Sequence, residues 1–196
     1  PSEAQSVETI LAALEAGMTF IDTADVYCLD HTDYGHNERL IAQALRQWKG
    51  TRPLVGTKGG LRRPEAAWTR DASPAALRAA CEASLKALGV GCIDLYQLHA
   101  PDEKCPFADS VGMLETLRKE GKILQIGLSN VTAAQIREAQ RIAPISTVQN
   151  RFSLFFRQVL SDGVLDLCTQ SEIGFLAYSP VGGGRLHQKL PGHPAA

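Results

Sequence analysis

The 196-residue chain is 44% hydrophobic and 21% charged, and its formal net charge at pH 7 is -1. This composition is that of a globular protein with one sizeable core, and so small a charge gives no reason to expect a nucleic-acid partner. No apolar run is long enough to cross a bilayer, and five scattered cysteines argue against a disulfide framework, so we expect a cytoplasmic protein without a membrane partner.

Amphipathic helical patterns alternate with short apolar runs along the chain. Helices are expected over about 2–16, 37–49, 74–88, 109–120 and 162–171, with another that begins at 132. Apolar runs predict strands at 18–22, 53–58, 93–99, 123–130, 145–150 and 175–178. Strand–helix alternation of this kind predicts an α/β fold with a parallel sheet.

The expected strands are too few for a closed barrel. A (β/α)₈ TIM barrel has eight strand–helix units and takes about 250 residues. We therefore expect residues 1–196 to form a single partial TIM-barrel domain of about six units, in which the first and last strands are missing. Two long connections, 28–36 and 59–72, follow strands and so lie at the active face, where Arg62, Arg63 and Trp68 can shape a substrate pocket.

The first three expected strands end on side chains that suit proton transfer. Asp22, Lys58 and His99 stand at these ends, and Tyr27 follows Asp22 closely. A buried ammonium is costly unless it is paired, so Asp22 is the expected counter-ion of Lys58. A positive charge favours the phenolate form of a nearby tyrosine. Tyr27 can therefore exchange a proton with a carbonyl or alcohol oxygen that His99 orients.

The later strands end on groups that complement the carboxamide of a nicotinamide. Their side chains supply hydroxyl and amide groups, and an aromatic ring offers a stacking surface. A glycine-rich loop with one arginine then follows, and such a loop can approach a pyrophosphate. Ser129 and Asn130 can equally cap the helix that follows them. We expect the cofactor-binding residues to be Ser129, Asn130, Gln149, Tyr178, Ser179, Gly182 and Arg185.

Two other kinds of chemistry find little support. Cys28, His31 and His36 are close in sequence, but their spacing matches no common zinc pattern, so we expect no metal. The chain also has no Gly-x-Ser-x-Gly elbow, which argues against a hydrolase.

Short motifs along nearly the whole chain form a joint pattern. They are Asp22–Tyr27, Gly35–Glu38, Thr57–Gly60, Asp94–His99, Ile126–Asn130, Val148–Phe152 and Leu176–Pro180. Together they resemble the aldo/keto reductase family. The resemblance implies a (β/α)₈ barrel that uses NADPH, with NADH not excluded, to reduce aldehydes and ketones to alcohols.

The resemblance also implies a role for each candidate residue. Tyr27 is the expected general acid, Asp22 and Lys58 tune it, and His99 orients the small-molecule carbonyl substrate. Tyr34, which directly precedes Gly35, is the alternative acid; the short spacing from Asp22 favours Tyr27.

Two matters stay open at this point. The family's last strand region, which grips the adenosine and its 2′-phosphate, is among the strands expected to be missing, so the preference for NADPH rests on the resemblance. The alternative function is that of a non-catalytic, cofactor-binding regulatory subunit of the same fold.

Overall fold

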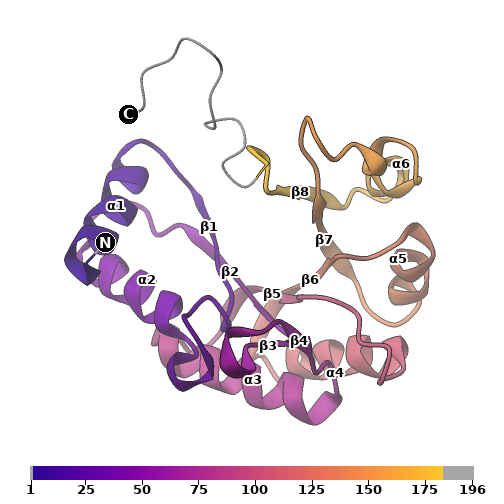
Figure 1. The fold of residues 1–196 in the computed structure, drawn as a ribbon, viewed down its shortest axis with the longest axis horizontal. Helices are drawn as coiled ribbons and strands as arrows, with labels where there is room; N and C mark the ends of the chain where they lie inside the picture. Colours follow the sequence, from indigo (N-terminus) through magenta and orange to yellow (C-terminus); the bar gives the residue numbers. More distant parts are fainter. Residues whose placement is uncertain (1, 183–196) are drawn as a thin grey trace.

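Six parallel strands form one curved sheet in the computed structural model, which describes residues 2–182 (Figure 1). The sheet order is β1-β2-β5-β6-β7-β8, and each adjacent pair is parallel. The curled half-barrel confirms the predicted fold class, a (β/α)₈ fold that is incomplete. The strands are β1 (Phe20–Asp22), β2 (Leu54–Gly59), β5 (Ile93–Leu98), β6 (Ile123–Ser129), β7 (Ile145–Arg151) and β8 (Gly174–Tyr178).

The α-helices cover the convex face of this sheet (Figure 1). Their ends follow local sequence signals: Ser2 and Gln5 form a capping box, Ser73 caps α3, and Gly89 ends that helix in the left-handed conformation. No helix within residues 2–182 has the length and hydropathy needed to span a bilayer. The helices are α1 (Glu3–Glu15), α2 (His36–Gln47), α3 (Pro74–Leu88), α4 (Phe107–Lys119), α5 (Ala133–Gln140) and α6 (Val164–Gln170).

Alternation along the strands separates the core from the site. Leu98 and Leu128 are fully buried in the hydrophobic core with Leu114 of α4. Burying a side chain of this size contributes about 1.5–3 kcal/mol. Successive strand residues point to opposite faces, so Gln97 and Ser129, adjacent to these leucines, face the concave side of the sheet. The same pattern that builds the core therefore places polar groups inside the half-barrel.

The long connection after β2 contains a hairpin that the sequence pattern did not predict. Strands β3 (Leu61–Arg62) and β4 (Thr69–Arg70) pair antiparallel, with a 3₁₀ turn between them at Pro64–Ala66. Each strand has only two residues, too few for a periodic pattern to be detected. Two further 3₁₀ turns, His31–Asp33 and Gln158–Leu160, lie in other connections.

Gly59, at the end of β2, allows the fully buried Tyr96 to pack against the strand. A Cβ atom at this position would overlap the Tyr96 hydroxyl oxygen and lie 3.2 Å from the Cβ of Ala80. We predict that Gly59→Ala lowers the free energy of unfolding by about 1–3 kcal/mol, because the buried ring must move. Denaturant unfolding followed by circular dichroism measures this change.

Gly112, inside α4, is the matched control, since a Cβ there meets no atom within 4 Å. Gly112→Ala should stabilise the chain by about 0.5–1 kcal/mol through helix propensity. Equal unfolding midpoints for Gly59→Ala and Gly112→Ala would contradict the packing explanation.

Candidate active site

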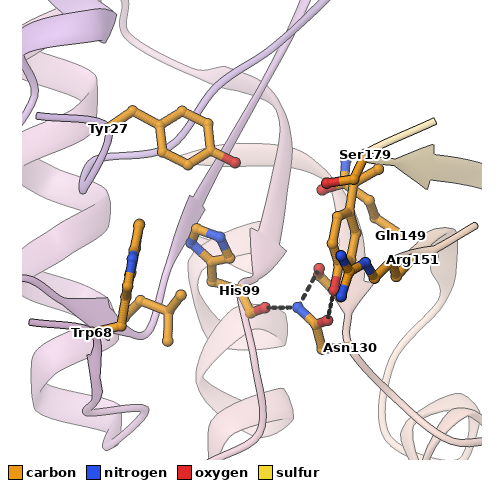
Figure 2. Close-up of a pocket in the computed structure, with 10 residues that line it drawn as sticks. Tyr27, Trp68, His99, Asn130, Gln149, Arg151 and Ser179 are labelled. Atoms are coloured by element: carbon orange, nitrogen blue, oxygen red, sulfur yellow. Dashed lines mark hydrogen bonds between the residues drawn. The ribbon is translucent and has the colours of Figure 1, made fainter. Parts of the chain in front are cut away.

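A cavity of about 720 Å³ opens at the carboxyl ends of the strands. It gathers seven of the predicted catalytic and cofactor residues, together with Trp68, which was expected to shape a substrate pocket, and two residues that were not predicted, Leu61 and Arg151. Figure 2 shows two facing walls, one with Tyr27, Trp68 and His99, and the other with Asn130, Gln149, Arg151 and Ser179. Ser129 and Tyr178 also line the cavity.

Lys58 lies beside this cavity with its side chain completely buried. Its Nζ donates to Asp22 Oδ2 at 2.6 Å, to the backbone oxygen of Thr23 at 2.8 Å and to Tyr27 Oη at 3.3 Å. Each ammonium proton thus has an oxygen partner, which offsets the cost of burying the charge. The ion pair expected from the sequence is present, and it touches the tyrosine hydroxyl directly.

The position of Tyr27 distinguishes it from Tyr34. Tyr27 lines the cavity, and its ring centroid lies 5.8 Å from that of His99. The hydroxyl of Tyr34 instead accepts a hydrogen bond from the backbone N–H of Arg63 at 2.7 Å, and Tyr34 is not among the residues that line this cavity. Of the two tyrosines considered, only Tyr27 reaches both Lys58 and the cavity.

His99 follows β5 and is only 8% exposed. Burial, together with the nearby charge of Lys58, lowers the pKa of His99 to about 3, so its imidazole is neutral at physiological pH. Its Nδ1 atom is buried without a hydrogen-bond partner among residues 2–182. The rings of His99 and Trp68 form an edge-to-face pair, with the centroids 6.4 Å apart.

Arg63 supports the Trp68 wall from the hairpin side. Its guanidinium lies 4.3 Å from the centre of the Trp68 ring, and it donates to the backbone oxygen of Leu29 at 3.1 Å. This contact joins the hairpin to the 28–36 connection. Both connections that were expected at the active face therefore meet beside the cavity.

Asn130 braces the opposite wall through its side-chain amide. Its Nδ2 donates to the His99 backbone oxygen at 3.0 Å and to Ser129 Oγ at 3.1 Å, while its Oδ1 accepts from the Tyr178 hydroxyl at 2.8 Å. The residue adopts a left-handed conformation, with φ 58°. The helix-capping alternative is not adopted, since Thr132 caps α5. Asn130 fixes the Tyr178 ring beside the cavity.

Gln149 and Ser129 present polar groups that suit a carboxamide. Both are buried yet line the cavity, and the Gln149 side chain makes no hydrogen bond within the described part of the chain. An amide that both donates and accepts, a hydroxyl and the braced ring of Tyr178 complement the hydrogen-bonding groups and flat face of a nicotinamide. These residues therefore fit a nicotinamide cofactor.

The turn after β8 holds two more of the predicted cofactor residues. Ser179 has a φ of 52°, Gly182 has a φ of 65°, and the Gly182 N–H donates to the Ser179 backbone oxygen at 2.9 Å. Arg185, the last predicted cofactor residue, lies outside the described residues.

Behind the site lie two buried carboxyl groups, those of Asp25 and Glu38, whose burial no sequence pattern indicated. Asp25 Oδ1 and Glu38 Oε2 have no hydrogen-bond partner among residues 2–182, although Glu38 Oε1 accepts from the Thr57 hydroxyl at 2.6 Å. Burial, reinforced by the nearby Glu38 carboxylate, raises the pKa of Asp25 to about 7. Burial also raises the pKa of Glu38. The spacing of the two acids in the sequence does not indicate that they are buried, so the pair is recognised only in the folded structure.

The raised pKa of Asp25 predicts a pH-dependent stability. The folded chain holds this proton more tightly than the unfolded chain, so the stabilisation is complete below about pH 3.8 and is lost as the pH rises through about 7. We predict that Asp25→Asn becomes more stable relative to the original chain by about 2 kcal/mol between pH 5 and pH 8. Thermal unfolding at both pH values tests this, with the exposed Asp166→Asn as control. A difference that does not change with pH would refute it.

The sequence matches the model of the Aldo/keto reductase family over residues 1–194, so the chain belongs to this family. A glycerol dehydrogenase from Gluconobacter oxydans is similar at 34% identity and a TM-score of 0.87, over 100% of this chain and 60% of that one. An aldo-keto reductase from Bacillus halodurans, in its holo form, is 28% identical with a TM-score of 0.81, over 98% of this chain and 63% of that one.

A third similar structure is an aldo/keto reductase from Klebsiella pneumoniae in complex with NADP and acetate. It is 31% identical with a TM-score of 0.78, over 98% of this chain and 64% of that one. The present chain thus spans 60 to 64% of the length of these three structures.

Proposed function

We propose that this chain belongs to an NADPH-dependent oxidoreductase that reduces aldehydes or ketones to alcohols. The observation that carries the proposal is the hydrogen bond from buried Lys58 to Tyr27 Oη, beside the neutral imidazole of His99. Membership of the family supports it, as does the similar Klebsiella pneumoniae structure with NADP. A small-molecule carbonyl is the class of substrate that this pair of groups suits.

The cofactor would lie against the wall that contains β6, β7 and β8. Gln149 and Ser129 would hydrogen-bond its carboxamide, and the Tyr178 ring would stack on its nicotinamide face. Ser179, Gly182 and Arg185 would contact the pyrophosphate, while Asn130 would act mainly by holding Tyr178 in place. When bound, NADPH supplies the hydride for the carbonyl carbon.

Tyr27 would give its hydroxyl proton to the carbonyl oxygen as negative charge develops there. The Lys58 ammonium, 3.3 Å from Tyr27 Oη, stabilises the phenolate that this transfer leaves behind. Asp22 keeps the ammonium in place through its 2.6 Å contact. In the reverse direction the phenolate would take the proton from an alcohol.

His99 would orient the substrate rather than transfer a proton. Its pKa of about 3 means that it approaches the substrate as neutral imidazole. We place the ring proton on Nε2, because Nδ1 is buried without an acceptor among the described residues. An Nε2–H donor directed at the carbonyl oxygen would hold that oxygen near Tyr27 Oη.

The test is NADPH oxidation at 340 nm with a reactive aromatic aldehyde. We predict that Tyr27→Phe lowers kcat by about 10²–10⁴-fold, because the general acid is lost. Its affinity for NADPH, measured by fluorescence titration, should stay within about twofold, since the lost hydroxyl does not bind the cofactor in this arrangement.

Tyr34→Phe is the matched control, and its turnover should stay close to that of the original chain. Full activity in Tyr27→Phe would remove Tyr27 from the account. NADPH binding without any oxidation, across several aldehydes and ketones, would favour the non-catalytic regulatory subunit.

A further inference from the structure

We propose that Gln97 is a positioning residue that holds Asp22 against Lys58, and that Thr147 and the bare backbone of Gly127 hold Gln97 in turn. The proposal deepens the function proposed above and rests on it for its effect on turnover. Its structural part concerns only the contacts among strands β1, β2, β5, β6 and β7. It assigns a role to a glutamine that neither the predicted site nor the cavity lining contains.

Gln97 binds the side of Asp22 that Lys58 leaves free. Gln97 Nε2 donates to Asp22 Oδ1 at 2.9 Å, while Lys58 Nζ donates to Asp22 Oδ2 at 2.6 Å. The Asp22 side chain is 29% exposed, so without a second partner it could rotate towards solvent. Two donors on its two oxygens fix the plane of the carboxylate as well as its distance from Lys58.

Asp22 needs such a tether because of its place in the sheet. Strand β1 has only three residues, and among residues 2–182 it pairs with β2 alone. Gln97 lies on β5, on the far side of β2, so its side chain reaches across the concave face to the edge strand. The bond therefore joins the edge of the half-barrel to one of its inner strands.

The bond to Asp22 also sets the orientation of the Gln97 amide. A carboxylate only accepts hydrogen bonds, so the NH₂ group must face Asp22 and Oε1 must face away. Gln97 is completely buried, and its Oε1 has no partner among residues 2–182. A buried carbonyl oxygen without a hydrogen bond is costly, so we expect a donor near Gln97 Oε1.

Thr147 on β7 carries a hydroxyl that would serve as that donor. Its Oγ1 is likewise buried and without a partner among the described residues. A Cβ atom placed on Gly127, which lies between the two strands, would be 2.6 Å from Gln97 Cγ and 2.5 Å from Thr147 Oγ1. The Gln97 stem and the Thr147 hydroxyl therefore both pack over Gly127, where one water between them would join the Thr147 hydroxyl to Gln97 Oε1.

Four polar side chains, of Thr147, Gln97, Asp22 and Lys58, lie in a row across the floor of the site, and hydrogen bonds join Gln97 to Asp22 and Asp22 to Lys58. Thr147 stands two residues before Gln149 on the same face of β7, and Lys58 contacts Tyr27. This row of side chains thus runs from the wall that would hold the nicotinamide to the group that would supply the proton. Gln97 is its central member.

The first test compares Gln97→Met with Gln125→Met. Gln125 lies on the adjacent strand β6, is exposed and makes no side-chain hydrogen bond within residues 2–182, so it serves as the control. We expect Gln97→Met to lower kcat by about 10–100-fold, as is common for groups that orient a functional side chain. The NADPH dissociation constant should change by less than about twofold, and Gln125→Met should match the original chain. Equal kcat values for Gln97→Met and Gln125→Met would overturn the proposal.

Gln97→Glu separates positioning from simple packing. The protonated carboxyl can donate to Asp22 as the amide does, whereas the ionised form repels it. Activity should therefore stay close to that of the original chain at the acidic end of the pH range and fall as the pH rises. A pH profile that coincides with that of the original chain would contradict the role.

A measurement without turnover distinguishes failure of this proposal from failure of the proposed function. The ammonium group of Lys58, buried with three acceptors, should give a slowly exchanging ¹⁵N-coupled proton signal in NMR spectra of the ¹⁵N-lysine-labelled chain. This signal should broaden or vanish in Gln97→Met and persist in Gln125→Met. If the original chain shows no turnover, the proposed function fails, and the NMR comparison still decides whether Gln97 holds the pair.

Discussion

The buried ammonium of Lys58 is the constraint on which the rest of the site depends. Its side chain is 0% exposed, and a charge in that position is tolerated only when oxygen atoms surround it. Asp22, the Thr23 backbone and Tyr27 supply those oxygens. The contacts of this one charge therefore join three segments at one point. These are the edge strand β1, the start of the 23–36 connection, and strand β2. The tyrosine that is proposed as the acid is held there as part of the same arrangement.

General features of a parallel α/β sheet bring the oxygen partners of Lys58 together. Parallel strands bring their carboxyl ends to one edge, and the alternation of side chains sends leucines to the helices and polar groups to the concave face. The Lys58 charge in turn helps to keep His99 neutral. Across the cavity, Asn130 ties the backbone of His99 to the ring of Tyr178, so the two walls are joined by hydrogen bonds as well as by the sheet.

The sequence was enough to predict the fold class, the helices and the ends of the strands. These features follow from local signals in the sequence. They are the hydrophobic periodicity, helix caps such as Ser73, and the polar residue at the end of each strand. From the sequence, either Tyr27 or Tyr34 can reach Lys58, depending on how the 28–36 connection folds back. The sequence favoured Tyr27 only because it lies few residues from Asp22. The structure places Tyr27, not Tyr34, beside the ammonium.

Other features depend on contacts between distant segments and could not be predicted from a local pattern. Gln97 looks like a routine polar residue in a strand until β1 and β5 are seen to share the concave face. Asp25 and Glu38 lie beside Ala79, Ala80 and Ala83 of α3, a helix that comes later in the chain. The hydrogen bonds of the Asn130 amide to the His99 backbone and Tyr178 likewise join segments that are distant in the sequence.

The Asp22–Lys58 pair can be tested most directly by a double-mutant cycle on the free energy of unfolding, with Asp22→Asn, Lys58→Met and the two changes combined. Asp22→Asn alone should cost about 3–5 kcal/mol, because it leaves a buried ammonium without its counter-ion. Adding Lys58→Met should recover a large part of that loss, giving a coupling energy above about 1 kcal/mol. Additive losses in the double variant would contradict the account, since they would mean that the two charges do not depend on each other.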